Sequence, residues 1–383
     1  MSQMSTPNSA GTRYSIMKRV SRPGLRHCLG VSALLFPAAW LVMSCAGTTE
    51  VAAPPDPAAV ALAERAAAIF GTLPEGVPNP ENVGSKAKID LGRMLYYDKR
   101  LSKNHDVACN SCHLLDAYGV DGEVTSLGHR GQRGGRNAPT VYNAALHISQ
   151  FWDGREPDVE AQAKGPVLNP VEMAMPSEEA VVNVLASIPG YVSAFAAAFP
   201  KDETPPGHSL DYDNMARAIG AFERNLMTPG RFDQFMAGDS TALDETERRG
   251  LKTFLSVGCN TCHTGSAVGG RLYRKLGFVI PYETKDIGRE AITGNPADRH
   301  VFKVPSLRNV AKTGPYFHDG SITDLSEVVR IMGYHQIGVK LEDGQIADIV
   351  AFLGSLTGTP DAEYIARPEL PESGPDTPAP DPS

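Results

Sequence analysis

Two stretches of the sequence share one pattern: CNSCH at residues 109–113 and CNTCH at residues 259–263. Each has two cysteines one helical turn apart and a histidine directly after the second, which is typical of c-type haem attachment. The thiols can form thioethers with the haem vinyl groups, and the adjacent imidazole can become an axial ligand of the iron. The pattern therefore predicts two covalently attached haems, on Cys109, Cys112 and His113 and on Cys259, Cys262 and His263.

Zinc binding is the main alternative for a Cys-x-x-Cys pair, but a zinc site needs four clustered ligands. A thioredoxin-like redox site would not need histidine as the next residue in both copies. The chain has six cysteines, and only Cys28 and Cys45 lie outside the two stretches. Once four cysteines carry haem, none remains in the body of the chain for a disulfide.

The beginning of the sequence has the composition of an export signal. Residues 27–49 contain no Asp, Glu, Lys or Arg and follow a segment with basic side chains, which predicts a signal over residues 1–45. The stretch LVMSC at 41–45 also resembles a bacterial lipobox, in which Cys45 would be lipidated. A plain signal peptide and an uncleaved anchor fit the same composition. We expect a periplasmic protein, with Cys45 as a candidate lipid anchor to the membrane.

The body of the chain is acidic. Five of the 36 Lys and Arg residues lie in residues 1–45, so 31 remain against 44 Asp and Glu, a formal charge of −13. This balance argues against binding nucleic acid, and it allows electrostatic steering of a partner with a basic docking face. The roughly 340 residues that follow the signal are enough for two hydrophobic cores.

The sequence pattern is mainly helical, with long Gly- and Pro-rich loops. We expect two cytochrome c-like domains, each around one haem, at residues 81–228 and 229–362. Residues 46–80 would form a tether and an N-terminal helix, and residues 363–383, rich in Pro and acidic side chains, would be disordered. Helices are expected at residues 58–70, 86–97, 177–199 with a break at Pro189 and Gly190, 212–227, 244–257 and 341–356.

The segment after each haem motif also repeats. PTVYN at 139–143 followed by FWDG at 151–154 aligns with PSLRN at 305–309 followed by FHDG at 317–320. The spacing from the proline to the asparagine and to the aspartate is 4 and 14 residues in both copies. The chain is therefore expected to hold two copies of one module, which differ at Trp152 and His318.

The sixth ligand of each iron decides whether that iron transfers electrons or binds substrate. Met332 is the only methionine after His263, and a distant downstream methionine is typical of electron-transfer haems. A methionine that only fills the core is the alternative. After the first motif the candidates are His129 and His147, and His129 lies among six glycines between residues 119 and 135. A ligand on such a loop could bind the iron in one redox state only, although a surface histidine would give the same pattern.

Five further stretches accompany the haem motifs: DKRLS at 98–102, RNAPT at 136–140, QFWDGR at 150–155, the run from Gly165 and Pro166 to Glu172 and Met173, and PYFHDG at 315–320. With them, the chain between residues 80 and 358 resembles the bacterial di-haem cytochrome c peroxidases. The resemblance implies a homodimeric enzyme that reduces hydrogen peroxide with electrons from a small cytochrome or copper protein. The haem on His113 would be the peroxide site, and the haem on His263 and Met332 would receive electrons.

The resemblance also implies roles for residues of the first half. His129 corresponds to a removable distal ligand of the peroxidatic haem, and Gln162 and Glu172 correspond to its distal pair. Glu172 could move a proton from the near oxygen of bound peroxide to the leaving oxygen, while Gln162 could orient the peroxide. Trp152 corresponds to a tryptophan between the two haems that could assist electron transfer, with plain packing as its alternative role.

A calcium site is implied as well. Asn137, together with the main-chain carbonyls of Thr313 and Pro315, corresponds to a site between the two haem domains. An oxygen-only site with so few protein ligands suits calcium, with water completing the coordination shell.

Two other functions share much of this pattern. A plain di-haem electron carrier would need permanent sixth ligands on both irons and would leave Gln162 and Glu172 without a purpose. The di-haem enzyme that matures methylamine dehydrogenase has a tyrosine in place of the axial methionine. Met332 argues against that enzyme.

Overall fold

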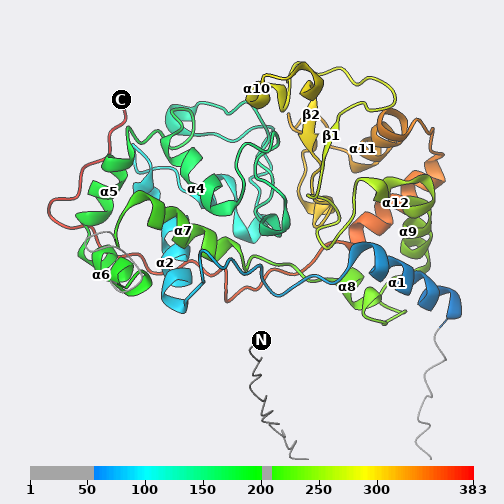
Figure 1. Cartoon of the computed structure of the whole chain (residues 1–383), viewed down its shortest axis with the longest axis horizontal. Helices are drawn as coiled ribbons and strands as arrows, with labels where there is room; N and C mark the ends of the chain where they lie inside the picture. The colour runs from blue at the N-terminus through cyan, green and yellow to red at the C-terminus, as the bar shows by residue number, and fades with distance from the viewer. Residues whose placement is uncertain (1–55, 201–208) are drawn as a thin grey trace, which may run out of the picture. The chain divides into compact units, whose positions relative to one another are not determined.

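The computed structural model of the chain describes residues 56–200 and 209–383. The predicted export signal, Cys45 and the tether up to residue 55 lie outside these residues. The described chain is mainly helical, as the sequence predicts, and it also contains a small two-stranded sheet (Figure 1). Within the described ranges no single helix is long and apolar enough to cross a membrane, and one bent pair, Glu178–Ala186 with Pro189–Ala198, meets that test only in combination.

The α-helices are α1 (Pro57–Phe70), α2 (Lys86–Tyr97), α3 (Cys109–Cys112), α4 (Val159–Leu168), α5 (Glu178–Ala186), α6 (Pro189–Ala198), α7 (Tyr212–Glu223), α8 (Arg231–Met236), α9 (Glu245–Val257), α10 (Glu290–Thr293), α11 (Leu325–Met332) and α12 (Asp343–Ser355). Short 3₁₀-helices are η1 (Lys99–Leu101), η2 (Leu115–Ala117), η3 (His129–Gly131), η4 (Ala144–Leu146), η5 (Cys259–Thr261), η6 (Pro296–Asp298) and η7 (Val310–Lys312), and η8 (Gly333–Ile337) is a π-helix. Strands β1 (Tyr273–Lys275) and β2 (Val301–Lys303) pair antiparallel. Each predicted helical stretch is present, and α3, α4, α8, α10 and α11 are additional.

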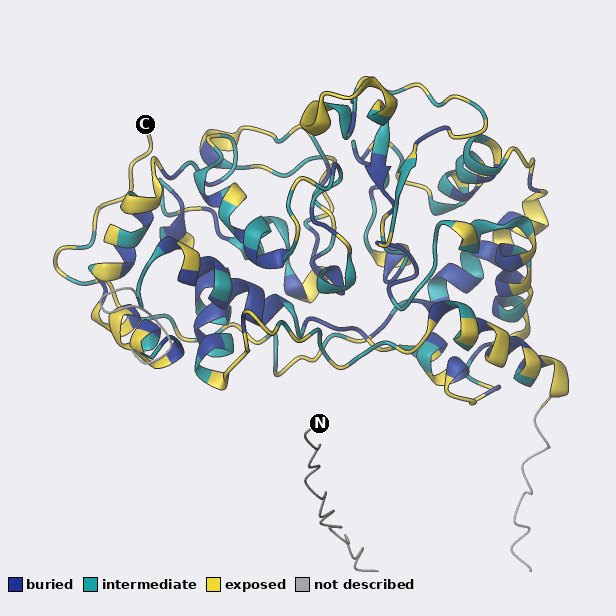
Figure 2. Cartoon of the chain, in the orientation of Figure 1, coloured by how far each residue is buried: buried dark blue, intermediate teal, exposed yellow. Residues whose placement is uncertain are grey.

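The buried side chains form two hydrophobic cores (Figure 2). The first core lies among α2, α4, α5, α6 and α7, and the second lies among α8, α9, α11 and α12. Helix α1 belongs to the second core, because Phe70 packs edge-on against Phe232 with their ring centroids 5.5 Å apart. From α1 onward the described chain therefore belongs first to the second core, then forms the first core, and then returns to the second.

The helices begin where side chains can satisfy their free N–H groups. Ser85 accepts a hydrogen bond from Lys88 N at the start of α2, and Asp211 accepts one from Asn214 N at the start of α7. Asp244 and Glu247 form a reciprocal capping box at the start of α9. Such caps give each helix a defined first residue, usually worth about 1 kcal/mol.

The two cores are built around the same kind of helix crossing. In the first, a Cβ on Gly92 of α2 would lie 1.9 Å from the carbonyl oxygen of Ala218 in α7. In the second, a Cβ on Gly250 of α9 would lie 1.8 Å from the carbonyl oxygen of Asp348 in α12. Each helix pair therefore needs glycine at its closest approach.

Replacing Gly250 with Ala should destabilise the second core by about 2 kcal/mol or more, because backbone atoms must move to admit the methyl group. The measurement is the shift in the thermal unfolding midpoint. Gly344→Ala is the control, since no atom lies within 4 Å of a Cβ at that position in α12. A Gly250→Ala protein that unfolds at the same temperature as the control would contradict the close crossing.

The predicted repeat is confirmed by the backbone and by one shared hydrogen-bond acceptor. Asn143 and Asn309, which align in the two copies, both have left-handed backbone angles, with φ of 60° and 61°. Each donates its side-chain amide to Thr228 Oγ1 at 2.9 Å. The aligned Trp152 and His318 also meet, with ring centroids 6.5 Å apart. The two copies thus face each other across Thr228.

Residues 363–383 differ from the expectation of disorder. This strap has no helix or strand but lies along the first core as an extended segment, red in Figure 1. Tyr364 stacks on Phe222 at 5.1 Å, Tyr97 donates its hydroxyl to Ile365 O at 2.5 Å, and Ser187 donates to Thr377 Oγ1 at 2.9 Å. Composition predicts disorder here because the partners that hold the strap belong to distant parts of the chain.

Candidate haem centres

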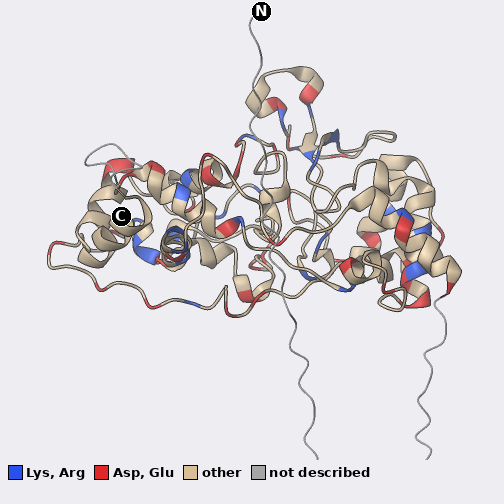
Figure 3. Ribbon diagram, turned by 60° about the horizontal axis from the view of Figure 1, so that its bottom comes forward, with Lys and Arg blue, Asp and Glu red and all other residues tan. Residues whose placement is uncertain are grey.

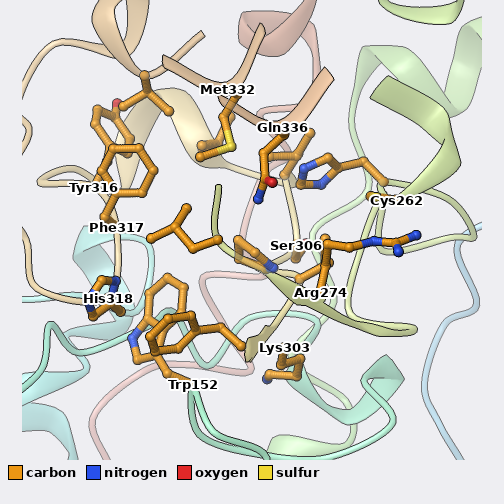
Figure 4. Close-up of a pocket in the computed structure, with 18 of the residues that line it drawn as sticks. Trp152, Cys262, Arg274, Lys303, Ser306, Tyr316, Phe317, His318, Met332 and Gln336 are labelled. Atoms are coloured by element: carbon orange, nitrogen blue, oxygen red, sulfur yellow. The ribbon is translucent and has the colours of Figure 1, made fainter. Parts of the chain in front are cut away.

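The second haem motif opens onto a cavity of about 470 Å³ (Figure 4). Cys259, Cys262 and His263 line it together with Met332, the predicted sixth ligand. Burial lowers the pKa of His263 to about 4, so its ring is neutral near pH 7 and can offer a nitrogen lone pair to a metal. The cavity thus brings the predicted attachment and axial residues of the second centre together.

Met332 is the last residue of α11, and the chain continues directly into the π-helix η8. Single π-helical turns often occur at functional sites, because they redirect side chains. Gln336 in this turn accepts a hydrogen bond from Phe278 N at 2.9 Å, which ties the turn to another residue that lines the cavity. In Figure 4 both Met332 and Gln336 extend into the cavity.

Buried cations in the same cavity suit the carboxylates of a haem. Lys303 Nζ lies 3.1 Å from His147 Nδ1, and burial lowers the pKa of Lys303 to about 8. Arg274 Nε and His147 Nε2 are buried and have no hydrogen-bond partner among the described residues. A cofactor with an apolar ring and two propionates would supply both the packing and the missing acceptors.

The first haem motif forms helix α3, and its two cysteines are half-buried, like those of the second motif. Burial raises the pKa of the Cys109 thiol to about 12 and that of Cys112 to about 11, with Asp121 and Glu172 adding to the rise at Cys112. His113 directs Nδ1 toward Gly119 O at 3.4 Å, which leaves Nε2 as the nitrogen free to bind iron. Burial also lowers the pKa of His113, so its ring is neutral.

The Gly-rich loop and the turn after α4 converge near this motif. His129 is 4% exposed, and its main-chain N–H donates to the main-chain oxygen of Glu172 at 2.7 Å. A Cβ on Gly128 would lie 2.1 Å from Val171 O, so only glycine allows the two segments to approach this closely. The structure therefore brings His129 and Glu172 together, although they are far apart in sequence.

The surroundings of Glu172 shift the pKa of its carboxyl group upward. Burial raises its pKa above the ordinary value of 4.5, while the positive charge of Arg155 and a hydrogen bond from Asn169 oppose the rise. A carboxylate whose pKa is raised is a stronger base than an ordinary glutamate, which suits a group that accepts a proton and returns it. Gln162 lies half-buried on α4, the helix that leads into this turn.

The structure separates the two candidate ligands of the first haem. His147 lines the cavity at the second haem motif, beside Lys303, whereas His129 lies beside Glu172. Of the two downstream histidines, His129 is therefore the one near the first motif. The sequence alone leaves both candidates open, because both histidines follow His113 in the sequence and nothing local distinguishes them.

Trp152 lies at the junction of the two halves. Its indole N–H donates to Asn137 O at 2.9 Å, and its carbonyl accepts from Lys303 N at 2.8 Å. Arg136 joins the same region by ion pairs of 2.6 Å to both Asp153 and Asp286. Because both halves hold Trp152, its position next to the second cavity is fixed.

The three predicted calcium ligands, Asn137, Thr313 and Pro315, all line the cavity at the second haem motif. Asn137 donates its side-chain amide to Glu123 O at 3.0 Å and Val124 O at 3.3 Å, so its Oδ1 is the atom left for a cation. Thr313 and Pro315 belong to the second half of the chain. In the described part of the chain, no cluster of three or more His, Cys, Asp or Glu side chains has the arrangement of a metal site.

Several contacts at the two centres have no signal in the sequence. Lys303 and His147 are 156 residues apart, and Arg155 approaches Glu172 without any shared motif. His129 Nε2 lies 3.2 Å from the main-chain oxygen of Ser383, 254 residues away. Only the fold brings these groups together.

The fold and the two centres define a class: a helical protein of two related halves, each with one c-type haem motif. Residues 86–241 match the sequence model of the family described as di-haem cytochrome c peroxidase. The chain belongs to this family, which implies that it carries two haems.

Relatives support the same assignment over most of the chain. A cytochrome c551 peroxidase of Nitrosomonas europaea is 45% identical over 302 residues, which cover 78% of this chain and 87% of the relative. A cytochrome c551 peroxidase of Pseudomonas aeruginosa is 44% identical over 328 residues, covering 84% and 92%. Among solved structures, a MauG-like protein associated with microbial copper homeostasis is similar with a TM-score of 0.67 and 30% identity, covering 77% of this chain and 97% of that one.

Proposed function

We propose that the protein reduces hydrogen peroxide to water, using electrons from a small cytochrome or copper protein in the periplasm. The observation that carries this proposal is the meeting of His129 and the half-buried Glu172 beside the first haem motif. A pure electron carrier has no use for a proton-transfer group at that place. The haems would be attached at Cys109 and Cys112 in residues 81–228 and at Cys259 and Cys262 in residues 229–362.

When bound, the haems supply the iron that binds peroxide and the two electrons that reduce it. The residues of the first half supply the proton chemistry. Glu172 accepts the proton from the near oxygen of peroxide and returns it to the far oxygen, which leaves as water. Gln162 orients the peroxide by hydrogen bonding. Two electrons and two protons in total convert each peroxide to two water molecules.

The residues of the second half serve electron entry. His263 and Met332 would be the axial ligands, and a thioether ligand raises the reduction potential so that a donor can reduce this centre first. Trp152 lies between the halves and could assist transfer to the first centre. Release of His129 after that first electron would open the first centre to peroxide.

Three further parts of the proposal concern the setting of the enzyme. Residues 1–45 would direct export, with Cys45 as the candidate lipid anchor, and a homodimer is the assembly that the resemblance implies.

Lys, Arg, Asp and Glu are spread over both halves (Figure 3). A donor would therefore be steered by a local patch and not by a uniformly charged face.

The alternative function is that of the di-haem enzyme that matures methylamine dehydrogenase, since the MauG-like structure is similar to this chain at 30% identity. This identity is lower than that of the two cytochrome c551 peroxidases. Met332 lines the cavity at the second haem motif, where that enzyme has a tyrosine ligand. Peroxidase activity is therefore the better proposal.

Steady-state turnover tests the function directly. The full protein with both haems is mixed with peroxide and a reduced small cytochrome c or copper protein, and donor oxidation is followed. Peroxide-dependent oxidation at a rate of at least about 1 s⁻¹ is expected. Oxidation that does not depend on peroxide, or no oxidation by donors of either type, would reject the proposal.

Removing calcium should impair activation more than haem retention. Chelation leaves the covalent thioethers intact but releases the link between Asn137 and the carbonyls of Thr313 and Pro315. We expect peroxide turnover and formation of the half-reduced open haem to fall, with an unchanged haem spectrum in denaturant. Asn137→Ala should mimic chelation and make further chelation ineffective. Full turnover in metal-free protein would exclude the site.

A further inference from the structure

The strap of residues 363–383 ends beside the predicted removable ligand. The main-chain oxygen of Ser383 lies 3.2 Å from His129 Nε2. Lys103 Nζ donates to the same oxygen at 2.8 Å and to Ser383 Oγ at 3.1 Å. Asp381 adds a second attachment, because its N–H donates to Lys103 O at 2.9 Å.

This contact is part of one network with the distal turn. Lys103 N donates to Met173 O at 2.8 Å, and His129 N donates to Glu172 O at 2.7 Å. The end of the strap, His129 and the turn that carries Glu172 are therefore held together by Lys103. A change at any one of them reaches the others through one or two hydrogen bonds.

The protonation of the imidazole makes the Ser383 contact incompatible with iron binding through the same nitrogen. A main-chain oxygen can only accept a hydrogen bond, so His129 Nε2 must carry the hydrogen. A nitrogen that carries hydrogen has no lone pair for a metal. His129 Nδ1 is buried and has no hydrogen-bond partner among the described residues.

We propose that the strap is a positioning element that holds His129 Nε2 away from the iron of the first haem and so favours the open peroxide site. This inference rests on the proposed function, since it requires a haem in the first half and His129 as its removable ligand. The strap competes with the iron for one nitrogen. Its last residues therefore adjust how readily the first centre opens.

The strap is attached elsewhere, so its last residues can be removed alone. Arg100 Nη1 donates to Ser373 Oγ at 3.0 Å, and Ser187 donates to Thr377 Oγ1 at 2.9 Å. Gly374 packs against Ser187 O, where a Cβ would lie 2.1 Å away. A variant that stops after Pro380 loses the contacts to His129 and Lys103 but keeps these.

The test measures the ratio of open to His129-ligated first haem in this shortened variant. The ratio is read from the high-spin and low-spin bands of the fully oxidised and half-reduced protein, without peroxide. We expect it to fall about fivefold in the shortened protein, the effect of one lost hydrogen bond. Cyanide, a probe of the open iron, should bind the shortened protein more weakly by a similar factor.

Two further variants separate the proposed role from general loosening of the fold. Lys103→Met should shift the ratio in the same direction, because it removes the ammonium group that binds Ser383 O and Ser383 Oγ and that pairs with Asp381 Oδ2 at 3.4 Å. Thr377→Ala, farther from His129 on the same strap, should leave the ratio unchanged. In a His129→Gly background the shortened and full-length proteins should give identical spectra, since the ligand is gone.

An unchanged ratio in both redox states would overturn the inference. A rise in the open form would also overturn it, because it would mean that Ser383 supports His129 as a ligand through Nδ1. Either result is independent of turnover. Absence of peroxide reduction by the full-length protein would instead reject the proposed function.

Discussion

Replacing Glu172 with Gln should lower peroxide turnover by roughly 10²- to 10⁴-fold, the usual effect of losing a general acid-base group. Glutamine keeps the size and hydrogen bonding of the side chain but cannot accept and return a proton. Both haems should remain attached, and the second centre should keep its spectrum. Turnover with a reduced donor, together with haem spectra, measures the effect.

The pH dependence gives a second readout for the same residue. Because burial raises the pKa of Glu172 above 4.5, the base form is lost at a higher pH than for an ordinary glutamate. Turnover should therefore fall on acidification above pH 4.5, and this limb of the profile should disappear in Glu172→Gln. Glu179→Gln, at an exposed position in α5, is the control and should behave as the wild type. Wild-type turnover in Glu172→Gln would remove Glu172 from the mechanism.

Replacing Met332 with His should lower the reduction potential of the second haem, because an imidazole stabilises ferric iron more than a thioether does. Electron entry from the donor should then slow strongly or stop, although the first centre is unchanged. Redox titration of the haem bands and the rate of reduction by the donor measure the two effects.

Met236→Leu is the matched control for that change. Met236 is a buried methionine of the second core, and leucine has a similar volume. The control should keep the potential and the rate of electron entry. A half-reduced state that forms at the original potential in Met332→His would mean that Met332 is not the ligand.

Local sequence patterns predict much of the fold. The two haem motifs, the helices with a regular apolar face and the repeated Pro-to-Asp spacing each depend on neighbouring residues, which the sequence displays directly. Helix α4 is missed because it contains Gly165 and Pro166, and α8 and α11 are too short for a clear pattern. Helix α1 is predicted, but its place in the second core is not, since an amphipathic helix does not specify its partner.

The residues of the candidate centres also fall into two groups, those that the sequence predicts and those that only the fold identifies. A five-residue motif predicts the attachment cysteines and the histidine ligand of each haem. Met332 is predicted as a ligand because it is the only methionine after His263. The choice of His129 over His147 needs the fold, as do the contacts of Lys303. Composition predicts disorder for the strap because composition contains no information on Tyr97, Lys103 and Ser187, which bind it.

The path of the chain has a consequence for dissecting the protein. The second core requires α1 from before the first core, and the first core is covered by Tyr364 and Ile365 from after the second. Neither half is therefore a continuous segment that could be expressed alone with its core complete. During synthesis, the ribosome must release nearly the whole polypeptide before either half can close, and both haem motifs emerge before that point.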